Sequence, residues 1–166
     1  KWGKSEENFM ICGLGRTPKR EKQFQWVGPV TKHNNIYFYK SHDNQIKLRK
    51  LDDAKQYYVG VERGAYTDDF LQLNQFDKQL IRYTVGTKNL PLMLSSGRID
   101  LLLLSEKRMI KQLESLNLNS KKPEKALFAF SITDYMAFSN QTSPKLVNKI
   151  TAAYKALERE GKIYLH

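Results

Sequence analysis

Short apolar runs alternate with helical segments between residues 57 and 116, and this alternation constrains the fold more than any other feature of the sequence. Apolar clusters of about four to eight residues predict buried strands, and a capping residue before a longer amphipathic stretch predicts a helix. The predicted strands cover 57–61, 80–85 and 99–104, and the predicted helices begin at Thr67, Asn89 and Glu106. A strand–helix order of this kind favours a mostly parallel sheet with helices on both faces, which is an α/β fold.

The remaining predicted elements flank this alternating region. Further strands are expected over 9–13, 35–40, 126–131 and 135–138, with a helical turn over 19–23, a one-turn helix over 51–54 and a linker over 121–125. The last helix is expected after Ser143-Pro144. Its apolar stripe consists of Leu146, Ile150, Ala153 and Leu157, which recur at helical spacing and therefore predict its buried face.

The chain carries a net charge of +11, from 28 Lys and Arg residues against 17 Asp and Glu residues. Strong basicity is typical of proteins that bind nucleic acids or anionic membranes. Here the basic residues cluster only as short pairs such as Arg49-Lys50, so a solvated basic surface is favoured and direct nucleic-acid binding is not expected. No apolar run approaches the roughly 18 residues of a membrane-spanning helix. No N-terminal signal sequence is visible, so an export signal has been removed or never existed.

The sequence contains no recognisable catalytic or metal-binding pattern. Cys12 is the single cysteine and is interpreted as a small apolar residue of a buried strand; the histidines, His33, His42 and His166, are scattered. No serine lies in a Gly-x-Ser-x-Gly elbow, and the acidic pair Asp68-Asp69 is explained by the start of a helix. We therefore expect no catalytic residue, no metal, no cofactor and no enzyme activity.

The segment from Arg16 to Pro29 is the most informative about binding. A turn after a strand, followed by the start of a helix, presents free backbone N–H groups to an anion. An arginine just beyond that start can bind a carboxylate through two parallel hydrogen bonds. Such a site suits a small acidic or zwitterionic ligand.

Four segments of the chain carry a further signal. They are RTPKREKQFQWVGPV at 16–30, LDDAKQYYVGVERGAYTDDFL at 51–71, LSSGRIDLLLLSE at 94–106, and the stretch from SITDYMAFS to GKI at 131–163. Together they resemble bacterial periplasmic solute-binding proteins of family 3. The segments follow the family's order and span nearly all of the chain. The resemblance implies a type II periplasmic-binding-protein-like fold of two lobes with mostly parallel sheets, joined by two crossing strands, with the ligand between the lobes.

Mapped onto this chain, the resemblance assigns residues 1–32 and 130–166 to a partial first lobe and residues 33–129 to the second lobe. Family members begin with a further strand and helices that are absent before Lys1. The first lobe is therefore expected to be incomplete and to show apolar surface, which a homodimer or a domain swap would cover.

The resemblance also implies a set of ligand-binding residues: Arg20, Thr17, Gly15, Tyr66, Thr67 and Ser105. Arg20 stands at the position of the family's carboxylate-binding arginine, with a surface arginine paired with Glu21 as the alternative. Backbone amides near Thr17 and Thr67 would assist. Gly15 replaces a serine, Tyr66 replaces a threonine, and Ser105 replaces the acid that pairs with the ligand ammonium, which makes a standard α-amino acid a doubtful ligand. Tyr66 could stack on a ligand ring, close the cleft, or only pack.

The function implied by the resemblance is non-catalytic capture of a small solute by hinge closure, in an exported, periplasmic protein that serves a membrane ABC-type uptake transporter. A ligand-sensing domain of a receptor or regulator is the main alternative, because it uses the same fold. A degenerate relative of a murein-cleaving enzyme and a basic nucleic-acid binder are the two others.

Overall fold

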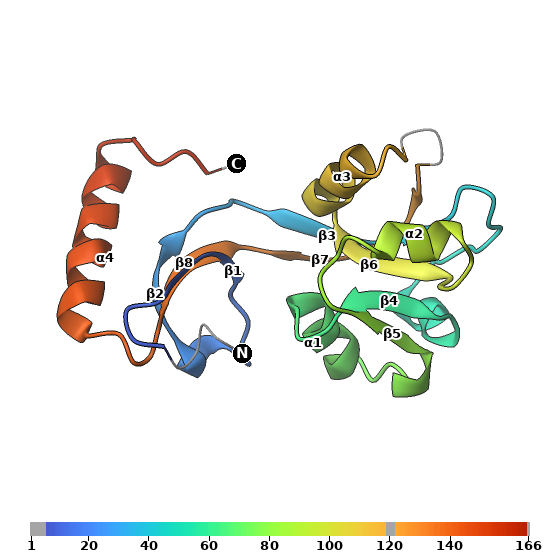
Figure 1. Ribbon diagram of the computed structural model, residues 1–166, viewed down its shortest axis with the longest axis horizontal. Helices are drawn as coiled ribbons and strands as arrows, with labels where there is room; N and C mark the ends of the chain where they lie inside the picture. Colours follow the sequence, from blue (N-terminus) through green and yellow to red (C-terminus); the bar gives the residue numbers. More distant parts are fainter. Residues whose placement is uncertain (1–5, 119–121, 166) are drawn as a thin grey trace. The chain divides into compact units, whose positions relative to one another are not determined.

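The computed structural model describes residues 6–118 and 122–165. The chain divides into two compact units (Figure 1). Unit 1 consists of Lys1–Asn34 together with Ile132–His166, and unit 2 of Asn35–Ser131. The lobe assignment taken from the resemblance stays a prediction.

Unit 1 is built on a three-stranded sheet in the order β1-β8-β2, with β1 over Met10–Gly15, β8 over Asp134–Ser139 and β2 over Phe24–Pro29. Both β1 and β2 pair with β8 in antiparallel fashion. A 3₁₀ turn at Glu21–Gln23 leads into β2, and the long helix α4 (Pro144–Arg159) packs against β2.

The core of unit 1 depends on a close approach between α4 and β2. Val27, Phe138, Val147 and Tyr154 form its buried cluster. The Tyr154 ring lies so near Gly28 that a Cβ atom at this glycine would come within 2.3 Å of it. The Tyr154 hydroxyl also donates a hydrogen bond of 2.8 Å to the carbonyl oxygen of Pro29. Only a residue without a side chain leaves room for this ring.

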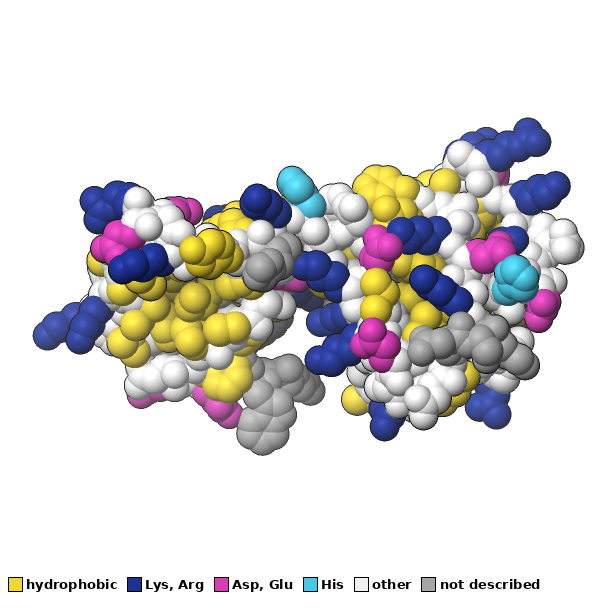
Figure 2. Space-filling view, turned by 90° about the horizontal axis from the view of Figure 1, so that it is seen from above, with side chains coloured by type: hydrophobic (Ala, Val, Ile, Leu, Met, Phe, Trp, Pro, Cys, Tyr) yellow, Lys and Arg dark blue, Asp and Glu magenta, His cyan; other side chains and the backbone are white. Residues whose placement is uncertain are grey.

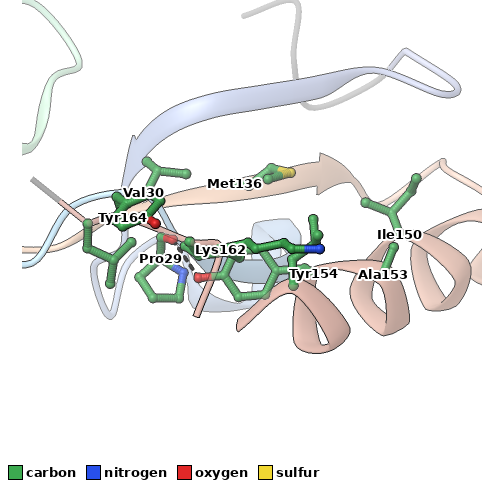
Figure 3. A pocket seen from close by; sticks show the side chains of 11 residues that line it. Pro29, Val30, Met136, Ile150, Ala153, Tyr154, Lys162 and Tyr164 are labelled. Carbon is green, nitrogen blue, oxygen red and sulfur yellow. Dashed lines mark hydrogen bonds between the residues drawn. The ribbon is translucent and has the colours of Figure 1, made fainter. Parts of the chain in front are cut away.

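An apolar groove of about 390 Å³ lies between α4, the end of β2 and the segment that follows α4 (Figure 3). Ile150, Ala153 and Leu157 of the predicted stripe line this groove. The space-filling view shows hydrophobic side chains exposed over unit 1 at the left of the picture (Figure 2). The sequence prediction of the helix is therefore confirmed, but the prediction of its buried face is wrong by one position: Val147 and Tyr154 are buried, whereas Leu157 is 45% exposed.

Unit 2 is an α/β unit around a five-stranded sheet in the order β5-β4-β6-β3-β7. Its strands are β3 (Asn34–Lys40), β4 (Val59–Glu62), β5 (Ile81–Thr84), β6 (Leu101–Ser105) and β7 (Glu124–Ile132). Its α-helices are α1 (Tyr66–Leu73), α2 (Leu90–Ser95) and α3 (Glu106–Ser115), with 3₁₀ turns at Leu51–Gln56 and Lys78–Leu80. The strand β4 runs parallel to β5 and β6, whereas β3 is antiparallel to β6.

Every residue of β6 is buried, because this apolar strand lies between β4 and β3 in the middle of the sheet. Leu102 and Leu104 pack with α2 and α3. The cluster that they join contains Tyr39, Leu90, Leu94, Ile99, Met109 and Leu113. The carboxyl ends of β4 and β6 meet at one edge of the sheet, which is where α1 and α3 begin.

The α/β fold class predicted from the sequence is confirmed, and all six elements predicted between residues 57 and 116 occur in the predicted order. The helical turn predicted over 19–23 is confirmed as a 3₁₀ turn at Glu21–Gln23. Two local predictions are wrong: α1 begins at Tyr66 with Ala65 rather than Thr67 as its cap, and Cys12 is exposed rather than buried. The strand β2 was not predicted. The linker predicted over 121–125 is wrong from Glu124 on, because β7 begins there. Lys121, the first residue of the predicted linker, lies outside the described residues. His166 lies outside them as well.

Within the described ranges, no helix is both long and apolar enough to cross a membrane. No group of three or more His, Cys, Asp or Glu side chains in this part of the chain is placed to hold a metal ion.

Candidate functional site

The turn between β1 and β2 in unit 1 contains three of the residues that the sequence singles out. Gly15 ends β1, and Thr17 and Arg20 follow it within five residues. The backbone N–H of Arg20 donates to the carbonyl oxygen of Thr17 at 2.9 Å, and that of Gln23 donates to the carbonyl oxygen of Arg20 at 2.9 Å. The Arg20 guanidinium bends back and donates through Nη1 to the carbonyl oxygen of Gly15 at 3.2 Å. The turn therefore holds this guanidinium against the end of β1.

Two buried oxygen atoms of this turn accept no hydrogen bond from the described part of the chain. They are the hydroxyl oxygen of Thr17 and the side-chain carbonyl oxygen of Gln23. The Gln23 amide nitrogen donates to the carbonyl oxygen of Lys19 at 2.7 Å, which fixes the orientation of the amide and leaves its oxygen as an acceptor. Buried polar atoms in proteins nearly always have a hydrogen-bond partner, and these two oxygen atoms have none among the described residues.

A second arginine, Arg16, is held at the start of the same turn. It donates to the Glu21 carboxylate through Nε at 2.8 Å and through Nη2 at 2.5 Å. The hydrogen bond from Arg16 lowers the pKa of Glu21, and the same bond raises the pKa of Arg16. Sequence reasoning missed this pairing, although the separation of five residues across a turn was visible in the sequence.

In unit 2, Tyr66 and Thr67 are both buried at the start of α1. The Tyr66 ring contacts Phe130 edge-on at 6.2 Å, and Phe130 stacks on Phe70 at 4.4 Å. These contacts give Tyr66 a packing role, one of the three alternatives that the sequence left open.

The Asp68 carboxylate already serves the start of α1. Although it is only 4% exposed, it accepts hydrogen bonds from the backbone N–H of Gly64 at 2.8 Å, from the side chain of Gln72 at 2.6 Å and from the Tyr83 hydroxyl at 3.2 Å. Burial, with the nearby Asp68 charge as the next cause, raises the pKa of Tyr83. A buried carboxylate at this helix start works against the binding of a second anion there.

Ser105 is fully buried at the end of β6, where its hydroxyl caps α3 by accepting from the backbone N–H of Arg108 at 3.3 Å. The Arg108 guanidinium pairs with Glu62 at 3.1 Å, which links the first turn of α3 to the end of β4. The predicted residues thus form two groups. Gly15, Thr17 and Arg20 lie in unit 1, and the other three lie in unit 2, at the sheet edge where α1 and α3 begin.

No family model and no curated protein matches the sequence. Solved structures do match the fold. A histidine kinase sensor domain with similarity to periplasmic binding proteins gives a TM-score of 0.80 at 14% identity over 93% of this chain. An ancestral arginine-binding protein bound to arginine gives 0.71 at 21% identity over 91%, and the arginine-, lysine-, histidine-binding protein ArtJ from Geobacillus stearothermophilus gives 0.74 at 18% identity over 92%.

These likenesses define the class of fold: the chain has a periplasmic-binding-protein-like α/β fold, as the sequence predicted. At these identities they show the fold alone. The chain spans 65%, 66% and 64% of the length of these three proteins, respectively.

Proposed function

We propose that this chain is the ligand-binding part of a non-catalytic, exported protein that captures a small anionic or zwitterionic solute, with the turn from Gly15 to Gln23 as the anion-binding element. The observation that carries the proposal is the combination, in one turn, of the Arg20 guanidinium and two buried oxygen atoms without a hydrogen-bond donor. The fold supports it, because the similar structures are binding proteins and sensor domains.

The charge of the turn sets the class of ligand. Between residues 16 and 22 it carries Arg16, Lys19, Arg20 and Lys22 against the single acid Glu21. A guanidinium can bind a carboxylate through two hydrogen bonds, and the Thr17 hydroxyl can donate a third. The Gln23 carbonyl oxygen can only accept, so a ligand with an N–H or O–H donor next to its carboxylate would make one further hydrogen bond in this turn.

Ser105 bears on whether the ligand carries an ammonium group. Ser105 supplies a neutral hydroxyl, already used as a helix cap, where the resemblance places an acid for the ligand ammonium. A cation without a counter-charge is costly to bury. We therefore favour a hydroxy acid or a dicarboxylate over a basic amino acid such as those bound by the similar proteins.

A titration of the protein with L-malate, succinate, L-glutamate and L-arginine tests this proposal. We expect L-malate to raise the melting temperature, with about 2.7 kcal/mol of added stability at a hundred times its dissociation constant. Succinate, which lacks the hydroxyl donor, should bind more weakly. The Arg20→Gln variant should lose the effect. The matched control Lys22→Gln, which removes one charge from the same turn, should keep it. Binding that survives in Arg20→Gln, or no binding of any of the four compounds, would contradict the proposal.

Sensing is the second candidate role, and it is favoured by the likeness to a histidine kinase sensor domain over 93% of this chain. Uptake and sensing require the same binding step and differ in the partner, a membrane transporter or a kinase. Hinge closure stays a prediction, which small-angle scattering with and without the bound compound would test. Homodimerisation or domain swapping stays a prediction as well.

A further inference from the structure

Arg16 contacts two aromatic rings from two different strands of unit 1. Its guanidinium carbon lies 5.2 Å from the centre of the Trp26 ring on β2 and 5.0 Å from the centre of the Tyr135 ring on β8. The two rings are nearly perpendicular, at 81°, with centres 5.8 Å apart. They form a corner that faces the guanidinium, and cation–π attraction favours this placement.

A second set of contacts joins the far end of the turn to the same corner. Glu21 receives two hydrogen bonds from Arg16 through its carboxylate, and its backbone carbonyl oxygen accepts from Trp26 Nε1 at 3.1 Å. Arg16, Glu21 and Trp26 are thus connected in a closed ring of contacts. The segment with Thr17 and Arg20 lies between the first two of them in the chain and is held at both ends.

We infer that Arg16 is a positioning residue, which fixes the turn that carries Thr17 and Arg20 without binding the anion itself. This inference rests on the proposed function for its biological meaning. Three contacts fix the Arg16 side chain, and the Glu21 carboxylate balances its charge. A single exposed ion pair contributes little to stability. Here the arginine–carboxylate pair is bidentate and the guanidinium also lies over two rings, so together these contacts restrict the backbone between Arg16 and Glu21.

Hydrogen exchange of the ligand-free protein tests the inference directly. The reporters are the backbone amides of Arg20 and Gln23, whose hydrogen bonds close the turn. We expect Arg16→Met to speed their exchange by roughly threefold to tenfold. The control is Arg63→Met. Arg63 lies over one aromatic ring, that of Tyr83 at 4.3 Å, but in unit 2, so this substitution should leave the exchange of both amides unchanged.

Two further variants separate positioning from a general loss of stability. Millimolar methylguanidinium should slow the exchange again in Arg16→Ala, because it can occupy the corner beside Glu21, and should do nothing in Arg63→Ala. Arg16→Lys should show intermediate exchange, because an ammonium keeps the charge and the ring contact but not the bidentate pair. Unchanged exchange in Arg16→Met, or no response of Arg16→Ala to methylguanidinium, would overturn the inference.

The Glu21→Gln variant separates positioning from direct anion binding. If Arg16 positions the turn, Glu21→Gln weakens the binding of succinate or L-malate. If Arg16 binds the anion, Glu21→Gln frees its guanidinium and strengthens that binding, which would overturn the inference. If the wild-type protein binds neither compound, the proposed function fails, while the exchange experiment on the ligand-free protein still decides the role of Arg16.

Discussion

Replacement of Gly28 by alanine tests whether unit 1 depends on the close contact between α4 and β2. The added Cβ atom would lie 2.3, 2.4 and 2.6 Å from three carbons of the Tyr154 ring. Because Tyr154 is only 7% exposed and its hydroxyl is bonded to Pro29, the ring has to shift against packed neighbours. Overpacking of this kind costs about 1–3 kcal/mol, and loss of the tyrosine hydrogen bond adds about 1 kcal/mol.

We therefore expect Gly28→Ala to lower the free energy of unfolding by about 2–4 kcal/mol, which corresponds to a fall of roughly 5–15 °C in melting temperature for a chain of this size. Circular dichroism during thermal and urea unfolding measures the change. Gly60→Ala is the comparison in unit 2: its Cβ would lie 2.5 Å from Ile99 Cδ1 and 3.1 Å from Leu90 Cδ2, both of buried side chains, so it should also destabilise the protein but leave the contact between α4 and β2 intact. The double variant Gly28→Ala/Tyr154→Leu removes the clash, and the two changes should cost less together than the sum of each alone. A Gly28→Ala protein within about 0.5 kcal/mol of wild type would refute the packing argument.

Three other predictions concern the site. Asp68→Ala removes a buried carboxylate and leaves three hydrogen-bond donors unpaired. It should lower the free energy of unfolding, measured with urea, by about 2–4 kcal/mol. The control Asp77→Ala, at an exposed 3₁₀ cap, should lower it by about 1 kcal/mol or less. Ser105→Ala removes the cap of α3 and should cost about 0.5–2 kcal/mol by the same measurement, and a neutral result would show that the cap does not stabilise the helix. The pKa of Glu21 is lowered from its ordinary value of 4.5, so its pairing with Arg16 contributes stability above that pH and loses it as the pH falls through the lowered pKa. In a Trp2→Phe background, Trp26 fluorescence should therefore change below pH 4.5, and the change should be absent in Glu21→Gln.

The sequence predicted the elements of unit 2 well, because their signals are local. The apolar run of β6 and the acids of the first turn of α1 act within a few residues of where they stand. The strand β2 was missed for the opposite reason. Phe24 to Pro29 shows neither clear alternation nor an uninterrupted apolar run, and becomes a strand because β8, more than a hundred residues later, pairs with it.

The candidate site was only partly predictable. Arg20 and Thr17 could be named through the resemblance of one short segment to a known family, and that segment closes into a turn of its own. Their role in binding stays a prediction. The role of Arg16 could not be predicted, because Tyr135, one of the two rings that it contacts, stands more than a hundred residues later in the sequence. No pattern of residues near Arg16 indicates that contact. The roles of Tyr66 and Ser105 as packing and capping residues likewise required their neighbours in space.

The helix α4 shows the difference between what the sequence determines and what the tertiary structure determines. By itself the sequence determined that residues 144–159 form a helix, because proline at its start and regular apolar spacing are properties of the segment alone. Two overlapping apolar stripes satisfy that spacing, one through Ile150 and Leu157 and the other through Val147 and Tyr154. Only the tertiary structure decided between them: the missing side chain of Gly28 opens a space on β2 that the Tyr154 ring fills, and burial of that ring fixes how the helix is rotated.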